Sequence, residues 1–116
     1  MIKCVIVGVG RWGQLLVNSS KNSEHIEFTH GVARTPSKVE EFCKGHDITL
    51  TDDYEKILGN ADVDAVVLAT PHTQHFDQIV KAAQAGKHVF CEKPYTLNRK
   101  QAIDALSVVR DAGIKT

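Results

Sequence analysis

Three glycines near the amino terminus have the spacing that binds the phosphates of a dinucleotide. Gly8, Gly10 and Gly13 form the pattern G-x-G-x-x-G, with Arg11 and Trp12 between the last two. In this pattern the first glycine permits a tight turn, the second lets the backbone approach a pyrophosphate, and the third lets a helix pack closely on a strand. The N–H groups at the start of that helix then face the phosphates. We therefore predict a dinucleotide site at this turn; the alternative is a strand-to-helix turn that binds nothing.

The residues that follow the second predicted strand bear on the identity of the cofactor. An acidic residue about twenty positions past the glycines usually holds the ribose hydroxyls of NAD. This sequence has Arg34 and Thr35 there instead. The guanidinium of Arg34 can pair with the 2′-phosphate of NADP, and Thr35 can donate its hydroxyl. We expect NADP to be favoured over NAD; the alternative is a solvated arginine beside a threonine that only caps a helix.

Two histidines with the spacing H-x-x-H follow the strongest apolar run of the chain. His72 and His75 could suggest zinc, but no cysteine or carboxylate has metal-ligand spacing with them, and we expect no metal site. We instead assign both histidines to the cofactor site together with Thr70 and Pro71, which are expected to shape a loop beside the nicotinamide ribose. A purely structural role for His75, in the first turn of the next helix, stays open.

A lysine between a glutamate and a proline follows the last predicted strand. Lys93 is flanked by Glu92 and Pro94. A lysine at this place can hydrogen-bond a substrate oxygen and assist proton transfer. We name Lys93 as the candidate catalytic residue; the alternative is an ordinary surface lysine.

Alternating strand and helix patterns predict the elements that bring these residues together. Apolar runs predict strands at residues 2–7, 26–32, 48–51, 64–70 and 88–91. Helical spacing predicts helices between them, among them one with Thr35 as its cap and Gly45 at its end, one capped by Asp52, and one at residues 98–112. Residues 114–116 resemble the first residues of a sixth strand.

This order predicts a single α/β domain over residues 1–116, with a doubly wound parallel sheet of the Rossmann type. It has five strands plus a truncated sixth. Ligands of such sheets bind outside the carboxyl ends of the strands, where the strand order reverses. The loops at residues 8–13, 33–36, 70–75 and 92–94 would meet there. Every candidate residue lies in one of these loops, so a single cleft is expected.

The composition of the chain bears on its binding partners and on its location in the cell. The 14 lysines and arginines balance the 14 aspartates and glutamates, which argues against a nucleic acid or a membrane surface as partner. No apolar run approaches the ~18 residues of a membrane span, and no signal peptide is recognisable. Three scattered cysteines, Cys4, Cys43 and Cys91, predict reduced core thiols rather than a disulfide or metal site. A reducing cytoplasm is the expected location.

Taken together, these motifs resemble the glucose–fructose oxidoreductase/inositol dehydrogenase (Gfo/Idh/MocA) family. The resemblance rests on the glycine pattern, on the apolar run that ends in Thr70-Pro71 before His75, and on His88-Val-x-Cys-Glu92-Lys93-Pro94. It implies NAD(P)-dependent hydride transfer at a carbon of a sugar, cyclitol or related small molecule. It also implies that Lys93 lies near the nicotinamide and the substrate, that Glu92 contacts the nicotinamide ribose region, and that the Lys93–Pro94 bond is more often cis than is usual before proline.

Family members continue into a C-terminal α/β domain that supplies the substrate pocket, further catalytic residues and an oligomerising sheet. The sequence lacks this domain, so we expect cofactor binding with negligible turnover, as in a fragment of an oxidoreductase, and binding of a small-molecule substrate only together with a second domain. Whether this chain is itself an enzyme stays open. The alternative is a stand-alone nucleotide-sensing or scaffold module. Because a second domain would cover apolar sheet surface and the edge of the fifth strand, we also expect self-association.

Overall fold

Five parallel strands form one sheet in the order β3-β2-β1-β4-β5. The computed structural model describes all residues, 1–116, and its strands are β1 (Ile2–Val7), β2 (Ile26–Val32), β3 (Thr49–Thr51), β4 (Ala65–Leu68) and β5 (His88–Cys91). The chain moves outward from β1 to β3 and then returns to the other side of β1, so the strand order reverses between β1 and β4. The doubly wound parallel sheet expected from the sequence is confirmed.

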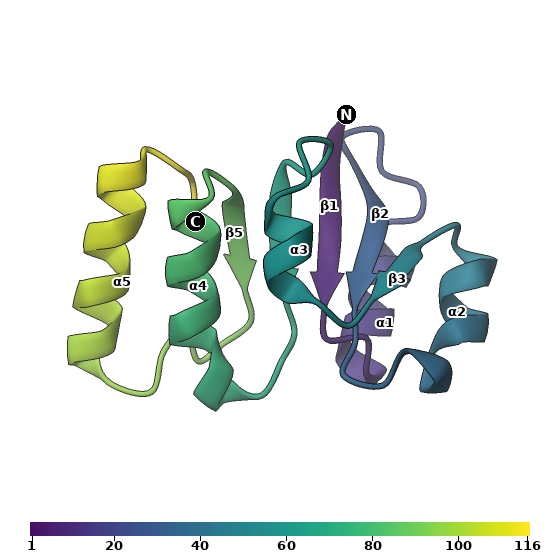
Figure 1. Ribbon diagram of the computed structural model, residues 1–116, viewed down its shortest axis with the longest axis horizontal. Coiled ribbons are helices and arrows are strands. Elements are labelled where there is room, and N and C mark those ends of the chain that lie inside the picture. Colours follow the sequence, from purple (N-terminus) through teal and green to yellow (C-terminus); the bar gives the residue numbers. More distant parts are fainter.

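Helices cover both faces of this sheet (Figure 1). Side chains of α1 (Arg11–Ser19) and α2 (Glu40–Gly45) pack into one apolar cluster, and those of α3 (Tyr54–Leu58), α4 (His75–Gln84) and α5 (Arg99–Ala112) pack into the other. Two short 3₁₀ turns, η1 (Pro36–Lys38) and η2 (His72–Gln74), precede α2 and α4. Each βα connection therefore delivers a loop to the carboxyl edge of the sheet.

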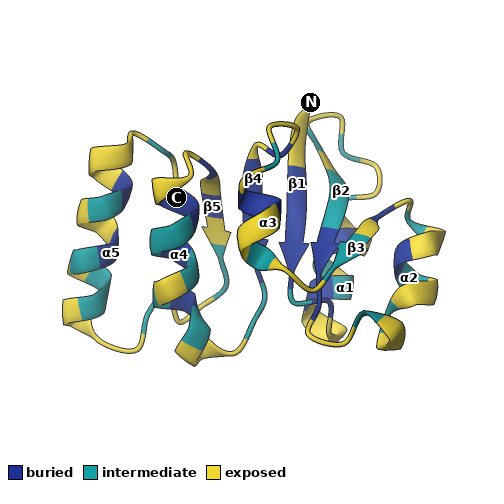
Figure 2. Ribbon diagram, in the orientation of Figure 1, coloured by how far each residue is buried: buried dark blue, intermediate teal, exposed yellow.

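The central strand carries the core because its side chains alternate between the two faces. Cys4 and Ile6 join the cluster of α1 and α2, whereas Val5 and Val7 join the cluster of α3, α4 and α5. All four are at most 3% exposed, and Figure 2 shows most of β1 as buried. Burying one such aliphatic side chain contributes roughly 1.5–3 kcal/mol. The carboxyl end of β1, where the glycine turn begins, is thus the most firmly held point of the sheet.

The second helix differs from its prediction. Thr35 makes no side-chain capping hydrogen bond, and Pro36 begins the separate turn η1. Lys38 and Val39 donate i→i+3 bonds to the carbonyls of Thr35 and Pro36, and Val39 has a φ of −126°, so α2 starts only at Glu40. Thr35 and Pro36 therefore begin the turn η1, at the cap position and the first position, and the prediction that they begin α2 is wrong. Gly45 does end α2.

The cap of α3 also differs by one residue. Asp53, not Asp52, accepts a hydrogen bond from the backbone N–H of Lys56, at 3.0 Å. The prediction of Asp52 as the cap is wrong. As a result, the carboxylate of Asp52 stays without a hydrogen-bonding partner at the carboxyl end of β3.

The last residues do not form a sixth strand. They lie along the outer edge of β5, where Val89 donates its N–H to the carbonyl of Lys115 at 2.9 Å. The N–H of Lys115 is in turn donated to Nδ1 of His88. One ladder bond is too few for a strand, so the expected truncated strand is present only as an extended segment beside β5.

Candidate functional site

The first and third glycines of the turn are required by its geometry. Gly8 has a φ of +90°, and a Cβ atom there would lie 2.7 Å from the carbonyl oxygen of Ala69. A Cβ atom on Gly13 would overlap the carbonyl oxygen of Gly8. Any larger residue would therefore separate α1 from β1 or push β4 away.

The middle glycine has a different surrounding. A Cβ atom on Gly10 would meet no atom within 4 Å. The first intrahelical bond of α1 runs from the N–H of Gln14 to the carbonyl of Gly10, so the N–H groups before Gln14 have no partner within the helix. No acidic residue lies in this first turn. Open space in front of unpaired N–H groups is what a pyrophosphate needs, so the residues present fit a dinucleotide.

A cleft of about 460 Å³ opens beside this turn at the carboxyl edge of the sheet. It contains the predicted residues Gly8, Arg34, Thr70 and Pro71. The loops after β1, β2, β3 and β4 all contribute to it. Its other lining residues are Val7, Val32, Asp52, Tyr54, Gln74 and Gln78.

A smaller, separate hollow of about 320 Å³ lies next to the cleft on the side of β5. It is lined by Trp12, Ala69, Thr70, His72, Glu92 and Lys93. Thr70 lines both spaces, so the glycine turn and Lys93 open on the same edge of the molecule. Lys93 is exposed and forms no ion pair, and its peptide bond to Pro94 is cis.

His75 joins the two loops that form this hollow. Its ring is fully buried, with Nδ1 lying 2.8 Å from the carbonyl oxygen of Pro94 and Nε2 lying 3.0 Å from that of Thr70. The ring therefore ties the loop after β4 to the loop after β5 rather than facing the open space. His72 is exposed, and the two histidine rings lie 5.8 Å apart.

Hydrogen bonds among residues that line the cleft were not anticipated from the sequence. Thr70 donates its hydroxyl to Oε1 of Gln78 at 2.6 Å, and Tyr54 donates its hydroxyl to the carbonyl of Gln78 at 2.7 Å. Burial, followed by the negative charge of Asp77, raises the pKa of Tyr54. Tyr54 thus remains a neutral donor and fixes the start of α3 against α4. The bond between Tyr54 and Gln78 could have been predicted only from knowledge that α3 packs against α4.

Not every predicted site residue lines the cleft or the hollow. Arg11 and Thr35 are exposed but border neither space, and Gly13 is buried beneath the turn. Gly10 opens toward solvent in front of α1. The remaining predicted residues other than His75 are brought together as expected.

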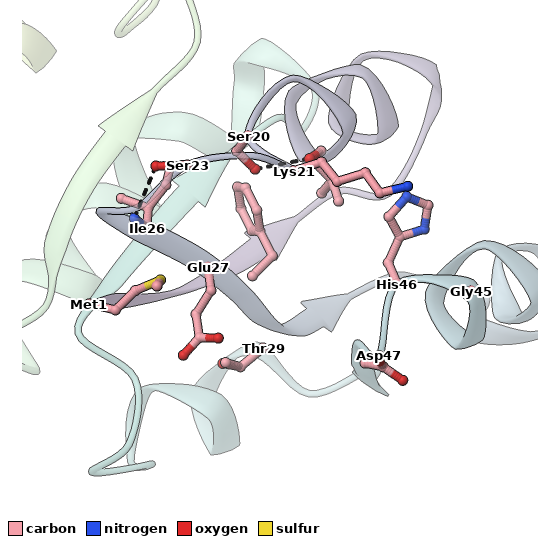
Figure 3. A pocket seen from close by; sticks show the side chains of 12 residues that line it. Met1, Ser20, Lys21, Ser23, Ile26, Glu27, Thr29, Gly45, His46 and Asp47 are labelled. Atoms are coloured by element: carbon pink, nitrogen blue, oxygen red, sulfur yellow. Dashed lines mark hydrogen bonds between the residues drawn. The ribbon is translucent and has the colours of Figure 1, made fainter.

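A further hollow lies at the opposite, amino edge of the sheet (Figure 3). Two of its serines are bonded to neighbouring backbone: Ser23 accepts from the N–H of Ile26, and Ser20 donates to the carbonyl of Val17. His46 has one ring nitrogen 2.8 Å from the carbonyl of Phe42 and the other 2.8 Å from the side-chain oxygen of Asn18. Elsewhere in the chain, no group of three or more metal-ligating side chains occurs, and every helix is too short or too polar to cross a bilayer.

Comparison with known proteins points to one family. A family model described as "Oxidoreductase family, NAD-binding Rossmann fold" matches residues 2–115. Two dehydrogenases of Bacillus subtilis (strain 168) are similar over nearly the whole chain. scyllo-Inositol 2-dehydrogenase (NADP⁺) is 28% identical, covering 98% of this chain and 35% of that protein. scyllo-Inositol 2-dehydrogenase (NAD⁺) is 31% identical, covering 97% and 34%.

The structural comparison agrees with the sequence comparison. KijD10, a 3-ketoreductase from Actinomadura kijaniata solved in complex with TDP-benzene and NADP, has a TM-score of 0.91 and 28% identity. The match covers 97% of this chain and 36% of that chain. The chain thus spans about a third of the length of the curated relatives that it matches.

Proposed function

Because this chain belongs to the Gfo/Idh/MocA oxidoreductase family, whose NAD(P)-binding Rossmann domain it forms, we propose that it serves hydride transfer. The hydride passes between a nicotinamide cofactor and a hydroxyl or carbonyl carbon of a sugar, cyclitol or similar small molecule. The observation that carries the proposal is the shared lining residue Thr70, which places the glycine-turn cleft next to the hollow that contains Lys93.

The residues of the turn bind and orient the cofactor. The N–H groups of Arg11 and Trp12, which have no partner within the helix, would hold the pyrophosphate beside the open space at Gly10. Thr70 and Pro71, with Glu92, border the nicotinamide ribose, and Trp12 and His72 complete the smaller hollow. His75 acts on this site indirectly, because it holds the two loops in place.

Lys93 is the residue that we assign to the chemistry. The nicotinamide ring, when bound, donates or accepts the hydride. In the direction of reduction, the ammonium group of Lys93 would donate a hydrogen bond and then a proton to the carbonyl oxygen of the substrate; in the direction of oxidation, the neutral amine of Lys93 would accept the proton of the hydroxyl. Lys93 is free to do so since no carboxylate pairs with it.

Arg34 supports a preference for NADP over NAD. Its side chain is exposed, lines the cleft and has no hydrogen bond or ion pair within the protein. A guanidinium without a partner can pair with both oxygens of a 2′-phosphate. Hydrogen bonds to a charged group correspond to roughly ten- to a hundredfold in affinity.

Titration of the protein with NADPH and with NADH, followed by calorimetry, tests the proposal. We expect saturable binding of both, tighter for NADPH. Gly10→Ala should weaken both by about tenfold or more, because its methyl group enters the pyrophosphate space. Gly45→Ala is the matched control, since a Cβ atom there also meets nothing within 4 Å but lies at the other edge of the sheet. Absence of binding by the folded wild-type protein would overturn the proposal.

Self-association is the second part of the proposal, and it rests on an apolar groove beside α1. Ile2, Leu16, Phe28 and Phe90 are among its lining residues, and Phe90 is 55% exposed at the edge strand β5. We expect concentration-dependent dimers in sedimentation experiments. Phe90→Lys should abolish them, whereas Ile103→Lys, an equally exposed position on α5, should not. A monomer at all concentrations would contradict this proposal.

The three cysteines support a reducing, cytoplasmic location for the protein. All are free thiols, and two of them, Cys4 and Cys43, are buried in the same apolar cluster. Reduced cysteines of this kind are typical of the cytoplasm.

A further inference from the structure

Two oppositely charged side chains, Arg34 and Asp52, line the cleft near the ends of β2 and β3. Only Arg34 was expected there from the sequence. Arg34 follows β2 and Asp52 follows β3. The two strands are joined at this point, because the N–H of Ala33 is donated to the carbonyl of Thr51 at 3.0 Å. Arg34 and Asp52 therefore leave neighbouring strands side by side, and both line the cleft with Gly8 and Thr70.

Neither of these two charges is used to stabilise the protein. Asp53, the next residue, caps α3 in place of Asp52. In the adjoining polar crevice, Lys81 pairs with Glu55 at 2.9 Å and with Asp77 at 3.2 Å. By contrast, Arg34 and Asp52 have no ion pair or side-chain hydrogen bond although both are exposed. The charges of Arg34 and Asp52 are therefore both available to a ligand of the cleft.

We propose that Asp52 is a specificity-determining residue for the cofactor, acting against Arg34. Its carboxylate accepts hydrogen bonds from the ribose hydroxyls of NAD and repels the 2′-phosphate of NADP. Arg34 has the opposite effect, since it attracts that phosphate. The site then accepts both cofactors, and the ratio of their affinities depends on these two side chains. This inference rests on the proposed function, because it presupposes that the cleft binds a nicotinamide dinucleotide.

Binding titrations with NADPH and NADH on charge-neutralised variants test the inference. Asp52→Asn removes the repulsion but keeps an acceptor for the ribose, so the NADPH-to-NADH affinity ratio should rise by about fivefold, as expected for one exposed charge near a phosphate. The rise should shrink at high ionic strength because salt screens exposed charges. Asp52→Ala also removes the acceptor, so NADH affinity should fall as well.

Asp47→Asn is the matched control. It removes the same charge from another exposed aspartate without an ion pair, which lies at the amino edge of the sheet. The affinity ratio should therefore stay close to that of the wild type. A ratio for Asp52→Asn that moves no further than for Asp47→Asn overturns the role of Asp52, while binding of both cofactors still supports the proposed function. A folded wild-type protein that binds neither cofactor overturns both.

Discussion

The two edges of the sheet differ in how their polar side chains are used. At the carboxyl edge, Arg34, Asp52 and Lys93 are exposed and have no ion pair. At the amino edge, Lys87 is only 9% exposed and donates to the carbonyls of Asn60, at 2.9 Å, and Val63, at 2.7 Å. Arg34, Asp52 and Lys93 thus have no partner within the protein, whereas Lys87 joins the start of β5 to the segment at residues 60–63.

This difference separates function from stability within one small domain. A buried charge that loses its hydrogen bonds has a large cost in folding free energy. Removal of an exposed charge without partners costs little folding free energy, so its substitution reports on binding rather than on stability. Substitution of Lys93 should therefore change activity without changing stability, and substitution of Lys87 should change stability.

The largest expected effect is on turnover, at the carboxyl edge. In an enzyme that carries this domain together with a substrate-binding domain, Lys93→Met should lower kcat by about 10²–10⁴-fold, the range for loss of an acid–base group. Cofactor affinity and melting temperature should hardly change because Lys93 is exposed and unpaired. Steady-state kinetics with a parallel NADPH titration measure this. Retained turnover would remove Lys93 from the mechanism.

At the amino edge the same substitution should act on stability alone. Lys87→Met leaves the carbonyl of Val63 without its donor, whereas the carbonyl of Asn60 still accepts from the N–H of Val63. We expect a loss of about 2 kcal/mol in unfolding free energy. Urea denaturation measures the loss, and Lys93→Met is the control, with a change within about 0.5 kcal/mol. Equal stabilities for the two variants would contradict the distinction between the edges.

A smaller effect is expected at high pH, from the thiol of Cys4 in β1. Burial, followed by the negative charge of Asp64, raises the pKa of Cys4 from 9.0 to about 11. Between these values the unfolded chain loses the proton and the folded protein keeps it, so stability falls as pH rises. The shift corresponds to about 2–3 kcal/mol. Thermal melts from neutral to alkaline pH should show a shallower decline for Cys4→Ala than for the wild type; parallel declines would contradict this origin.

Much of the fold could be predicted from the sequence, since local patterns determine it. The bounds of β1 and β2 agree with the apolar runs, and the spacing of Gly8 and Gly13 already implied a strand-to-helix turn with no room for side chains. The sequence pattern did not identify the cap of α3, because two adjacent residues are suitable. Asp52 and Asp53 can both cap a helix, and only the backbone geometry shows that Asp53 does so.

The candidate site was less predictable because its contacts join distant segments. The loops were expected to meet, but the burial of His75 between the carbonyls of Thr70 and Pro94 depends on how β4 and β5 are paired. The bond from Tyr54 to Gln78 likewise depends on the packing of α3 against α4. The periodicity of a single sequence does not predict contacts between segments that are distant along the chain.

The order of the strands also sets how the two halves of the cleft can open. β1 is central and paired on both sides, whereas β5 is a four-residue edge strand whose outer side meets only the segment at residues 114–116. Amide hydrogen exchange should therefore be slowest in β1 and faster in β5. The glycine turn then stands on the slowest-exchanging part of the sheet and Lys93 on a faster one. The contacts of the His75 ring with the carbonyls of Pro94 and Thr70 then hold the loop of Lys93 to the loop after the inner strand β4.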